Sequence, residues 1–452
     1  MKRNIGIWIS AAALGLAACA QQPTQPTPPP APPAASAPAP KPAAVAPAPA
    51  PAPIPAAAPA AAPAPAAAAA AKPAAPPPAW QQGRSAALAS SPLAPLAGRM
   101  TVTPPSEIPL DKLKLPPGFK IELWAHGMPG ARAMVRGDQG KIYIGTRIIG
   151  RVYEVTDNGK ERVSRVVVDK LTQPAGVEFR KGSLYVMAID KMLRFDGIES
   201  NPNAQPVDMT AAFKMPPEPH HNWKYIKFGP DGKLYVPFGA PCNICVPGEE
   251  YAQIRRYNAD GSGMEVIARG VRNTVGFDWH PHTKQLWFTD HGRDWMGDNS
   301  PSDELNRISK TGLNFGFPYC HATGVPDQDF KKDNPCAGVT LPVTDMGPHA
   351  AVLGIKFYTG KMFPAEYRNV AFIARKGSWN RTQKLGFDVV TVKATADGKQ
   401  AKITPFLTGF MDEKSQQFSG RPAYLMQMPD GSMLVSDEQL GAIYRISYAK
   451  KV

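Results

Sequence analysis

The chain has 452 residues, 51 of them proline, and its formal net charge is +14 at neutral pH. This length exceeds one average domain but does not fix the number of domains. The positive charge could indicate nucleic-acid binding, but no run of Lys and Arg is longer than two residues. We therefore expect no nucleic-acid partner, since a diffuse positive field suits a small polyanion or an anionic surface better.

Residues 1–18 are typical of an export signal, because two basic residues precede an apolar segment over 5–16 that is too short to span a bilayer. Leu16-Ala17-Ala18-Cys19 resembles the bacterial lipoprotein box, which implies cleavage before Cys19 and acylation of that residue. The residue after Cys19 is Ala20 and not Asp, which in Gram-negative lipoproteins implies sorting to the outer membrane. We expect a lipid anchor at the periplasmic face of the bacterial outer membrane; a secretion signal with a chance cysteine is the alternative.

Residues 19–79 are predicted to form a disordered tether. After Cys19 they are almost entirely Ala, Pro and Gln, and Lys41 and Lys72 carry the only charges. Such a segment has little to bury and favours partly polyproline conformations. The tether would separate the membrane anchor from a folded domain over residues 80–452.

A short strand pattern recurs six times in the folded part of the sequence. A turn such as Gly229-Pro230-Asp231-Gly232 often precedes it, and a second strand often follows. The six segments are Lys141–Ile144, Ser183–Val186, Lys233–Val236, Gln285–Phe288, Val370–Ile373 and Ser432–Val435. This repeat predicts an all-β fold, a six-bladed β-propeller, rather than a β-sandwich. Functional residues should then lie on loops at one mouth of the propeller.

An acidic loop follows the fourth of these strands. Residues 290–304 contain four aspartates and one glutamate, together with glycines. Carboxylate and main-chain oxygens are suitable Ca²⁺ ligands, although the spacing is not that of an EF-hand. A solvated acidic loop is the alternative.

Four further cysteines are Cys242, Cys245, Cys320 and Cys336. In an exported protein an even number favours disulfides, and we expect Cys242–Cys245 and Cys320–Cys336. Val246 follows the CxxC where haem attachment would need His, and no second CxxC lies nearby to complete a zinc site. A redox-active CxxC remains an alternative.

Several motifs occur together in the order of a known family. They are His221 with Phe228-Gly229-Pro230-Asp231-Gly232, Gly270-Val271-Arg272-Asn273, Thr289-Asp290-His291-Gly292-Arg293-Asp294, Asp303-Glu304-Leu305-Asn306, Lys376-Gly377-Ser378-Trp379-Asn380-Arg381 and Gly420-Arg421-Pro422. From about residue 115 onward the chain resembles the pyrroloquinoline quinone (PQQ)-dependent sugar dehydrogenases of the soluble glucose dehydrogenase type. It is most similar to the L-sorbosone dehydrogenase-like and pyranose dehydrogenase-like branch.

The resemblance implies a cofactor site built from cationic side chains. PQQ is a tricarboxylate quinone, and the guanidinium fork of Arg matches a carboxylate. Arg272 and Asn273 would lie near the quinone oxygens, where Arg272 would also serve catalysis. Lys376 and Arg421 would hold further carboxylates.

The sequence also departs from the family pattern. Pro422 and Ala423 follow Arg421, where the soluble glucose enzymes carry a second Arg. Arg381 or Arg147 could supply the missing contact. Gln173 is a weaker candidate for contacting cofactor or substrate.

By the same resemblance, His221 is the expected general base, taking the proton of the anomeric hydroxyl while hydride passes to the quinone. Neighbouring positive charge would favour the neutral imidazole that this role needs. His220 would be a neighbour or a substrate contact.

Calcium is the second cofactor that the resemblance implies. The main-chain carbonyls of Gly292 and Arg293 would bind a Ca²⁺ that polarises the quinone. A second, structural Ca²⁺ would lie near Asp303 and Glu304.

The sequence thus predicts an oxidoreductase that uses PQQ and Ca²⁺ to oxidise an aldose or a related, sorbosone-like sugar. Electrons would pass to a periplasmic acceptor, a quinone or a cytochrome. The alternatives are an envelope propeller that binds a glycan or protein without catalysis, and a Ca²⁺-dependent propeller lactonase.

Overall fold

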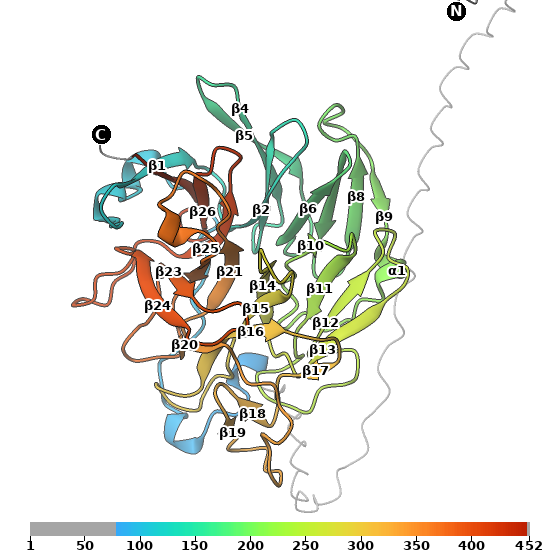
Figure 1. Ribbon diagram of the computed structural model, residues 1–452, viewed down its shortest axis with the longest axis vertical. Helices are drawn as coiled ribbons and strands as arrows, with labels where there is room; N and C mark the ends of the chain where they lie inside the picture. The colour runs from blue at the N-terminus through green and yellow to red at the C-terminus, as the bar shows by residue number, and fades with distance from the viewer. Residues whose placement is uncertain (1–77, 450–452) are drawn as a thin grey trace, which may run out of the picture. The chain divides into compact units, whose positions relative to one another are not determined.

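The computed structural model describes residues 78–449 (Figure 1). The predicted signal peptide, Cys19 and residues 20–77 of the predicted tether lie outside the described residues. Within residues 78–449, no helix has the length and apolar character needed to cross a membrane.

Six sheets form the blades of a β-propeller, which confirms the predicted fold (Figure 1). The first two blades consist of β2 (Ala131–Arg136), β3 (Ile142–Thr146), β4 (Val152–Asp157) and β5 (Arg162–Val168), and of β6 (Gly176–Arg180), β7 (Ser183–Met187), β8 (Met192–Asp196) and β9 (Pro206–Asp208). The third consists of β10 (Lys227–Phe228), β11 (Leu234–Phe238), β12 (Gln253–Tyr257) and β13 (Glu265–Arg269), with β17 (Leu313–Asn314) added parallel to β13.

The other three blades have four strands each. The fourth consists of β14 (Thr274–Trp279), β15 (Leu286–Asp290), β16 (Ser302–Ile308) and β20 (Thr344–Pro348), and the fifth of β21 (Val352–Phe357), β22 (Ala371–Arg375), β23 (Asp388–Lys393) and β24 (Lys402–Leu407). The sixth consists of β25 (Pro422–Gln427), β26 (Met433–Asp437), β27 (Ala442–Tyr448) and β1 (Phe119–Ala125).

The ring is closed by pairing the two ends of the propeller sequence. β1 lies antiparallel to β27, with Phe119 opposite Tyr448. The sixth blade therefore contains three strands from the end of the chain and one from before the first blade. This closure removes the free sheet edge that an open array of blades would expose.

The recurring strand pattern in the sequence corresponds to the second strand of every blade. β3, β7, β11, β15, β22 and β26 each include most of one predicted segment. These strands lie in the middle of their sheets and are buried over most of their length, because neighbouring blades cover both faces. The predicted turn before β11 is present, with Gly232 at a φ of 76° and its N–H donating to the Gly229 carbonyl.

Short elements complete the fold. They are the 3₁₀ turns η1 (Ala79–Gln81), η2 (Ala86–Leu88), η3 (Pro105–Glu107), η4 (Leu110–Lys112) and η5 (Ala365–Tyr367), the single-turn α1 (Thr210–Phe213) and the hairpin of β18 (Cys320–His321) and β19 (Val325–Pro326). Both expected disulfides are present: Cys242–Cys245 lies in the loop between β11 and β12, and Cys320–Cys336 joins β18 to the loop after β19.

Candidate functional site

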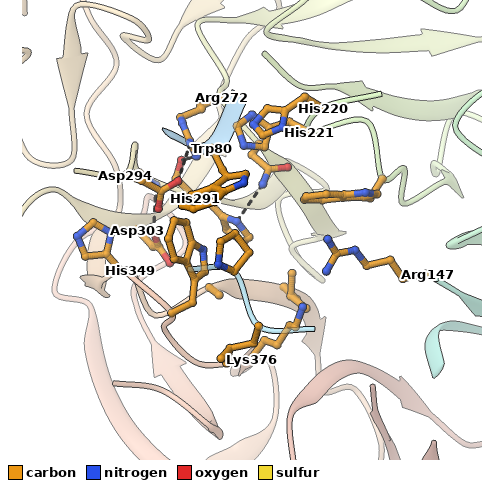
Figure 2. A pocket seen from close by; sticks show the side chains of 18 of the residues that line it. Trp80, Arg147, His220, His221, Arg272, His291, Asp294, Asp303, His349 and Lys376 are labelled. Atoms are coloured by element: carbon orange, nitrogen blue, oxygen red, sulfur yellow. Dashed lines mark hydrogen bonds and ion pairs between the residues drawn. The ribbon is translucent and has the colours of Figure 1, made fainter. Parts of the chain in front are cut away.

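One end of the propeller carries most of the residues singled out in the sequence. They lie just before the first strand of a blade or just after its second strand, as Arg272 does before β14 and His291 after β15. The first two strands of a blade are antiparallel, so these two positions lie at the same end of the sheet. Loops from different blades therefore converge on one mouth, as Figure 2 shows.

A cavity of about 260 Å³ opens at this mouth. Its lining includes five cationic side chains but only two carboxylates, those of Asp294 and Asp303. The cationic residues are Arg132, Arg147, Arg272, Lys376 and Arg421. All except Arg147 are at least nine-tenths buried. Burying so many like charges is costly unless an anion compensates them.

We call the five cationic side chains that line the cavity the cationic wall. The Glu438 carboxylate lies next to three of them. Its oxygens are 2.7 Å from Arg132 Nη2, 2.8 Å from Lys376 Nζ and 3.6 Å from Arg147 Nη1. Although burial alone would raise the pKa of Glu438, these cations hold it well below its usual range. Burial lowers the pKa of Lys376, and Glu438 offsets this only in part. One carboxylate thus faces three cations, and the wall retains an excess of positive charge.

Arg421 adds a fourth cation beside this group. Its guanidinium donates to the main-chain carbonyls of Lys376 (3.3 Å) and Gly377 (2.9 Å). Its main-chain N–H donates to the Asp437 carboxylate (3.0 Å). These contacts fix the guanidinium at the cavity without pairing it with a carboxylate at hydrogen-bond distance.

Arg272 is held by the disulfide loop of the third blade. Its Nε donates to the Asn243 carbonyl oxygen (2.9 Å) and its Nη2 to Asn243 Oδ1 (2.7 Å). Nη2 also lies 3.4 Å from Asp294 Oδ2. Asn243 stands between Cys242 and Cys245, so the disulfide helps to position this cation.

Asn273 offers an unsatisfied acceptor to the cavity. Its N–H donates to Asp290, and its Nδ2 lies 3.0 Å from His291 Nδ1, but its Oδ1 is buried without a partner. A buried acceptor of this kind is costly unless a ligand donates to it.

His221 has one fixed and one available ring nitrogen. Nδ1 lies 3.1 Å from the Ala240 carbonyl oxygen, which can only accept, so Nδ1 carries the proton and Nε2 has the free lone pair. Burial first, and then the nearby charges of His220 and Arg272, lower the pKa of His221 well below its ordinary value. The imidazole is therefore neutral and can accept a proton at Nε2.

The backbone at His221 is also unusual. Its φ is 52°, a left-handed conformation that is rare for a residue with a side chain. A Cβ at Gly239 would lie 2.3 Å from the His221 carbonyl oxygen, so only glycine permits this close approach.

The two other histidines near His221 are less suited to act as a base. His291 Nε2 lies 2.6 Å from the Val352 carbonyl oxygen and its Nδ1 accepts from Asn273, so both nitrogens are engaged. Burial lowers its pKa to about 3. His220 lines the cavity with its ring centroid 3.9 Å from that of His221, and burial lowers its pKa to about 4. Its Nε2 is buried and has no hydrogen-bond partner among residues 78–449.

The structure brings together most of the predicted site residues. His221, Arg272, Asn273, Lys376, Arg421, Gly292 and Asp303 all line the cavity. Of the two candidates for the missing cationic contact, Arg147 lines the cavity and Arg381 does not. Arg381 instead donates to the carbonyls of Asp298 and Gln383 at the surface. Gln173 lies in the turn before β6 and is not part of the lining.

The predicted calcium ligands are only partly assembled. Asp303 accepts from the N–H groups of Gly292 (3.0 Å) and Val352 (3.3 Å), and burial raises its pKa to about 7. Glu304, the next residue of β16, has different partners: it accepts from the main-chain N–H of Ala322 (2.6 Å) and from Asn306 Nδ2 (2.8 Å). The second calcium ion near Asp303 and Glu304 stays a prediction.

Arg293 also directs its side chain away from the predicted calcium site, toward Asp327 (2.9 Å) and Asp329 (2.8 Å). Its main-chain carbonyl remains compatible with a ligand role. Among residues 78–449, no three His, Cys, Asp or Glu side chains group as a metal site.

Sequence reasoning missed several residues of the site. Arg132, Glu438 and His349 were not singled out, nor were the cavity-lining tryptophans Trp80 and Trp223, and Trp379 was named only as part of a motif. Glu438 directly follows the second strand of its blade, the same position that His291 occupies. Position within the repeat was the signal that could have identified it.

The family model described as TrAA12-like matches residues 113–449. An uncharacterized protein of Borreliella burgdorferi is 33% identical over 351 residues, which cover 75% of this chain and 91% of that protein.

Solved structures with a similar fold include the calcium structure of the family AA12 carbohydrate-active enzyme of Trichoderma reesei. It has a TM-score of 0.64 and 18% identity over 75% of this chain and 97% of that one. The holo PQQ domain of pyranose dehydrogenase from Coprinopsis cinerea has a TM-score of 0.62 and 19% identity, with 74% and 97% covered. The apo soluble aldose sugar dehydrogenase of Escherichia coli has a TM-score of 0.53 and 17% identity, with 73% and 100% covered.

Proposed function

Because the chain belongs to the TrAA12-like family, we propose that it is a PQQ-dependent dehydrogenase that oxidises a sugar at a CH–OH group. The observation that carries this proposal is the excess of cations at the propeller mouth, where Arg132, Arg147 and Lys376 share the single carboxylate of Glu438 and Arg421 lies beside them. A non-catalytic glycan-binding propeller and a lactonase do not require such a cluster.

The chemistry of the cavity fits PQQ. The cofactor carries three carboxylates, and the cavity presents guanidinium groups that can bind carboxylates in a bidentate manner. Arg132, Lys376 and Arg421 would hold carboxylates on one side, and Arg272 and Asn273 would contact oxygens on the other. PQQ, when bound, supplies the hydride acceptor.

The protein's own contribution to the reaction is proton removal. His221 Nε2 would accept the proton of the substrate hydroxyl while the hydrogen on the same carbon transfers as hydride to the bound acceptor. A cyclic aldose would thereby become a lactone. The bond from Nδ1–H to the Ala240 carbonyl orients the ring and stabilises the imidazolium that forms. His220 is adjacent and can contact a second hydroxyl.

Calcium belongs to the same proposal. The main-chain carbonyls of Gly292 and Arg293 would hold it at the mouth, where the cavity lining also includes the carboxylates of Asp294 and Asp303. It would supply a positive charge that polarises the bound quinone.

The proposal also covers the sugar that is oxidised, the electron acceptor and the cellular location. We assign a sorbosone-like sugar or another aldose as substrate and a periplasmic quinone or cytochrome as acceptor. The lipoprotein box at Cys19 would anchor the chain at the periplasmic face of the outer membrane.

The experiment is reconstitution of the purified protein with PQQ and Ca²⁺, followed by dye reduction across a panel of aldoses and ketoaldoses. PQQ uptake with sugar-dependent dye reduction is expected. Absence of PQQ binding, or lactone hydrolysis without PQQ, would overturn the proposal.

A further inference from the structure

The segment before the propeller forms part of the cavity wall. We call residues 78–96 the strap. Trp80, Pro95 and Leu96 of the strap line the same cavity as His221 and Lys376. Figure 2 shows Trp80 near the middle of the site, among side chains contributed by the blades. The strap precedes residue 113, where the match to the family model begins.

Buried groups of the propeller bind the strap at several points. Asn243 donates from its main-chain N to Gln82 Oε1 (3.1 Å) and from Nδ2 to the Gln82 carbonyl (2.6 Å). Arg293 Nη2 donates to the Gly83 carbonyl (3.3 Å), and Trp295 Nε1 to the Trp80 carbonyl (2.6 Å). With the strap in place, Asn243, Arg293 and Trp295 are almost completely buried, so these hydrogen bonds are shielded from water.

The backbone on both sides is shaped for this contact. Gly83 has a φ of 70°, and a Cβ there would lie 2.1 Å from Arg293 Nη2. Trp295 has a φ of 72°, which is strained for a bulky residue and persists only where packing compensates it. The strap is therefore a built element of the mouth.

Trp80 is held in a cluster of three indoles. Its ring centroid lies 6.3 Å from that of Trp295 and 5.8 Å from that of Trp379, and the second pair is edge-to-face. Trp80 and Trp379 are half-buried and line the cavity, whereas Trp295 supports them from below. An indole fixed in this way presents a rigid apolar surface at little entropic cost.

We propose that Trp80 is a specificity-determining residue, the platform on which the apolar face of a single sugar ring packs, and that the strap excludes longer saccharides. This inference rests on the proposed function. With the strap in place, Trp80, Pro95 and Leu96 close one side of the cavity, which leaves less room for a second sugar ring. The cationic wall serves the cofactor, and the aromatic strap serves the substrate.

The test compares Trp80→Ala and Trp80→Phe with the unaltered full-length protein. Binding of a 1,5-anhydro sugar, which lacks the anomeric hydroxyl and cannot be oxidised there, is measured by calorimetry with and without PQQ. Trp80→Ala should raise its Kd about tenfold, and Trp80→Phe should recover most of the affinity.

Kinetics supply the second measurement. For Trp80→Ala, the ratio of kcat/KM for a disaccharide to that for its monosaccharide should rise about tenfold, mainly through KM for the monosaccharide. Gln81→Ala is the matched control, because Gln81 adjoins Trp80 without lining the cavity, and should leave both measurements unchanged.

The outcomes separate this proposal from the proposed function. Failure of PQQ to bind any of the proteins refutes the proposed function, while the sugar Kd measured without PQQ still tests Trp80. An unchanged sugar Kd in Trp80→Ala overturns the platform. So does tighter PQQ binding by that variant, because Trp80 would then occupy the cofactor's space.

Discussion

His221 illustrates how one side chain is prepared by contacts distant in sequence. Ala240 fixes its tautomer, Gly239 makes room for its main chain, and Arg272 discourages a second proton. The result is a neutral imidazole with Nε2 free for proton transfer. A histidine at the surface would share its residue type but none of these properties.

This environment predicts the pH dependence of turnover. Because the pKa of His221 is lowered from 6.5, the neutral base persists as the pH falls through that value. The acid limb of kcat/KM should therefore lie below pH 6.5, measured from about pH 5 to about pH 9. His221→Ala should lower kcat by about 10²–10⁴-fold while PQQ remains bound. An acid limb centred at pH 6.5, or full activity without His221, would contradict the assignment.

For Glu438 the prediction concerns the stability of the fold and not the rate of turnover. Glu438→Gln leaves Arg132, Arg147 and Lys376 without their shared carboxylate. The PQQ-free variant should lose about 3–5 kcal/mol of unfolding free energy, measured by urea denaturation.

The matched control for Glu438 is Glu122→Gln, which removes an exposed partner of Arg445 and should cost less than about 1 kcal/mol. PQQ carboxylates should replace the lost charge, so PQQ should raise the Tm of Glu438→Gln more than that of the unaltered protein. An equal or smaller rise would indicate that the cations do not meet the cofactor.

At the scale of elements, two disulfides have different consequences because their loops contact different residues. The Cys242–Cys245 loop presents Asn243, which binds Arg272 in the cavity and Gln82 in the strap. The Cys320–Cys336 loop encloses a longer segment that includes the β18–β19 hairpin.

Removing each disulfide should therefore separate stability from function. Replacing Cys320 and Cys336 with Ser should lower the unfolding free energy by about 3 kcal/mol. Replacing Cys242 and Cys245 should lower it by about 2 kcal/mol, since the loop that this disulfide closes is shorter. PQQ affinity should fall about tenfold only in the Cys242/Cys245 variant, through the loss of Arg272 positioning. Equal affinities in the two variants, measured by titration, would show that Asn243 does not depend on its disulfide.

The whole molecule depends on closure of the ring by β1. Phe119 at the start of β1 packs edge-to-face against Phe363, Phe406 and Tyr448, which come from different parts of the chain. Closure thus joins the last blade to the segment that follows the strap.

Phe119→Ala should lower the unfolding free energy by about 3 kcal/mol, measured by urea denaturation. Val163→Ala, at an exposed position of β5, is the control and should change it by less than about 0.5 kcal/mol. A loss confined to a local transition, with the other blades unaffected, would show that the ring does not unfold cooperatively.

Much of the fold could be predicted from the sequence, because it depends on local patterns. Each blade needs a buried second strand after a tight turn, and this requirement appears as an aromatic and β-branched run after Gly, Pro or Asp. The number of runs gave the number of blades, and the cysteine spacing agreed with both disulfides. His221, Arg272, Lys376 and Arg421 were also recognised, since each stands in a short motif.

Only the tertiary structure decided how these residues combine. The pairing of Glu438 with Arg132 and Lys376, the tautomer of His221, and the presence of Arg147 rather than Arg381 in the cavity lining all depend on residues from different parts of the chain that meet at the mouth. Trp80 joins them from outside the repeat. Sequence periodicity specifies a strand because neighbouring residues carry the signal, whereas a cavity is defined by distances between residues hundreds of positions apart, which no local pattern records.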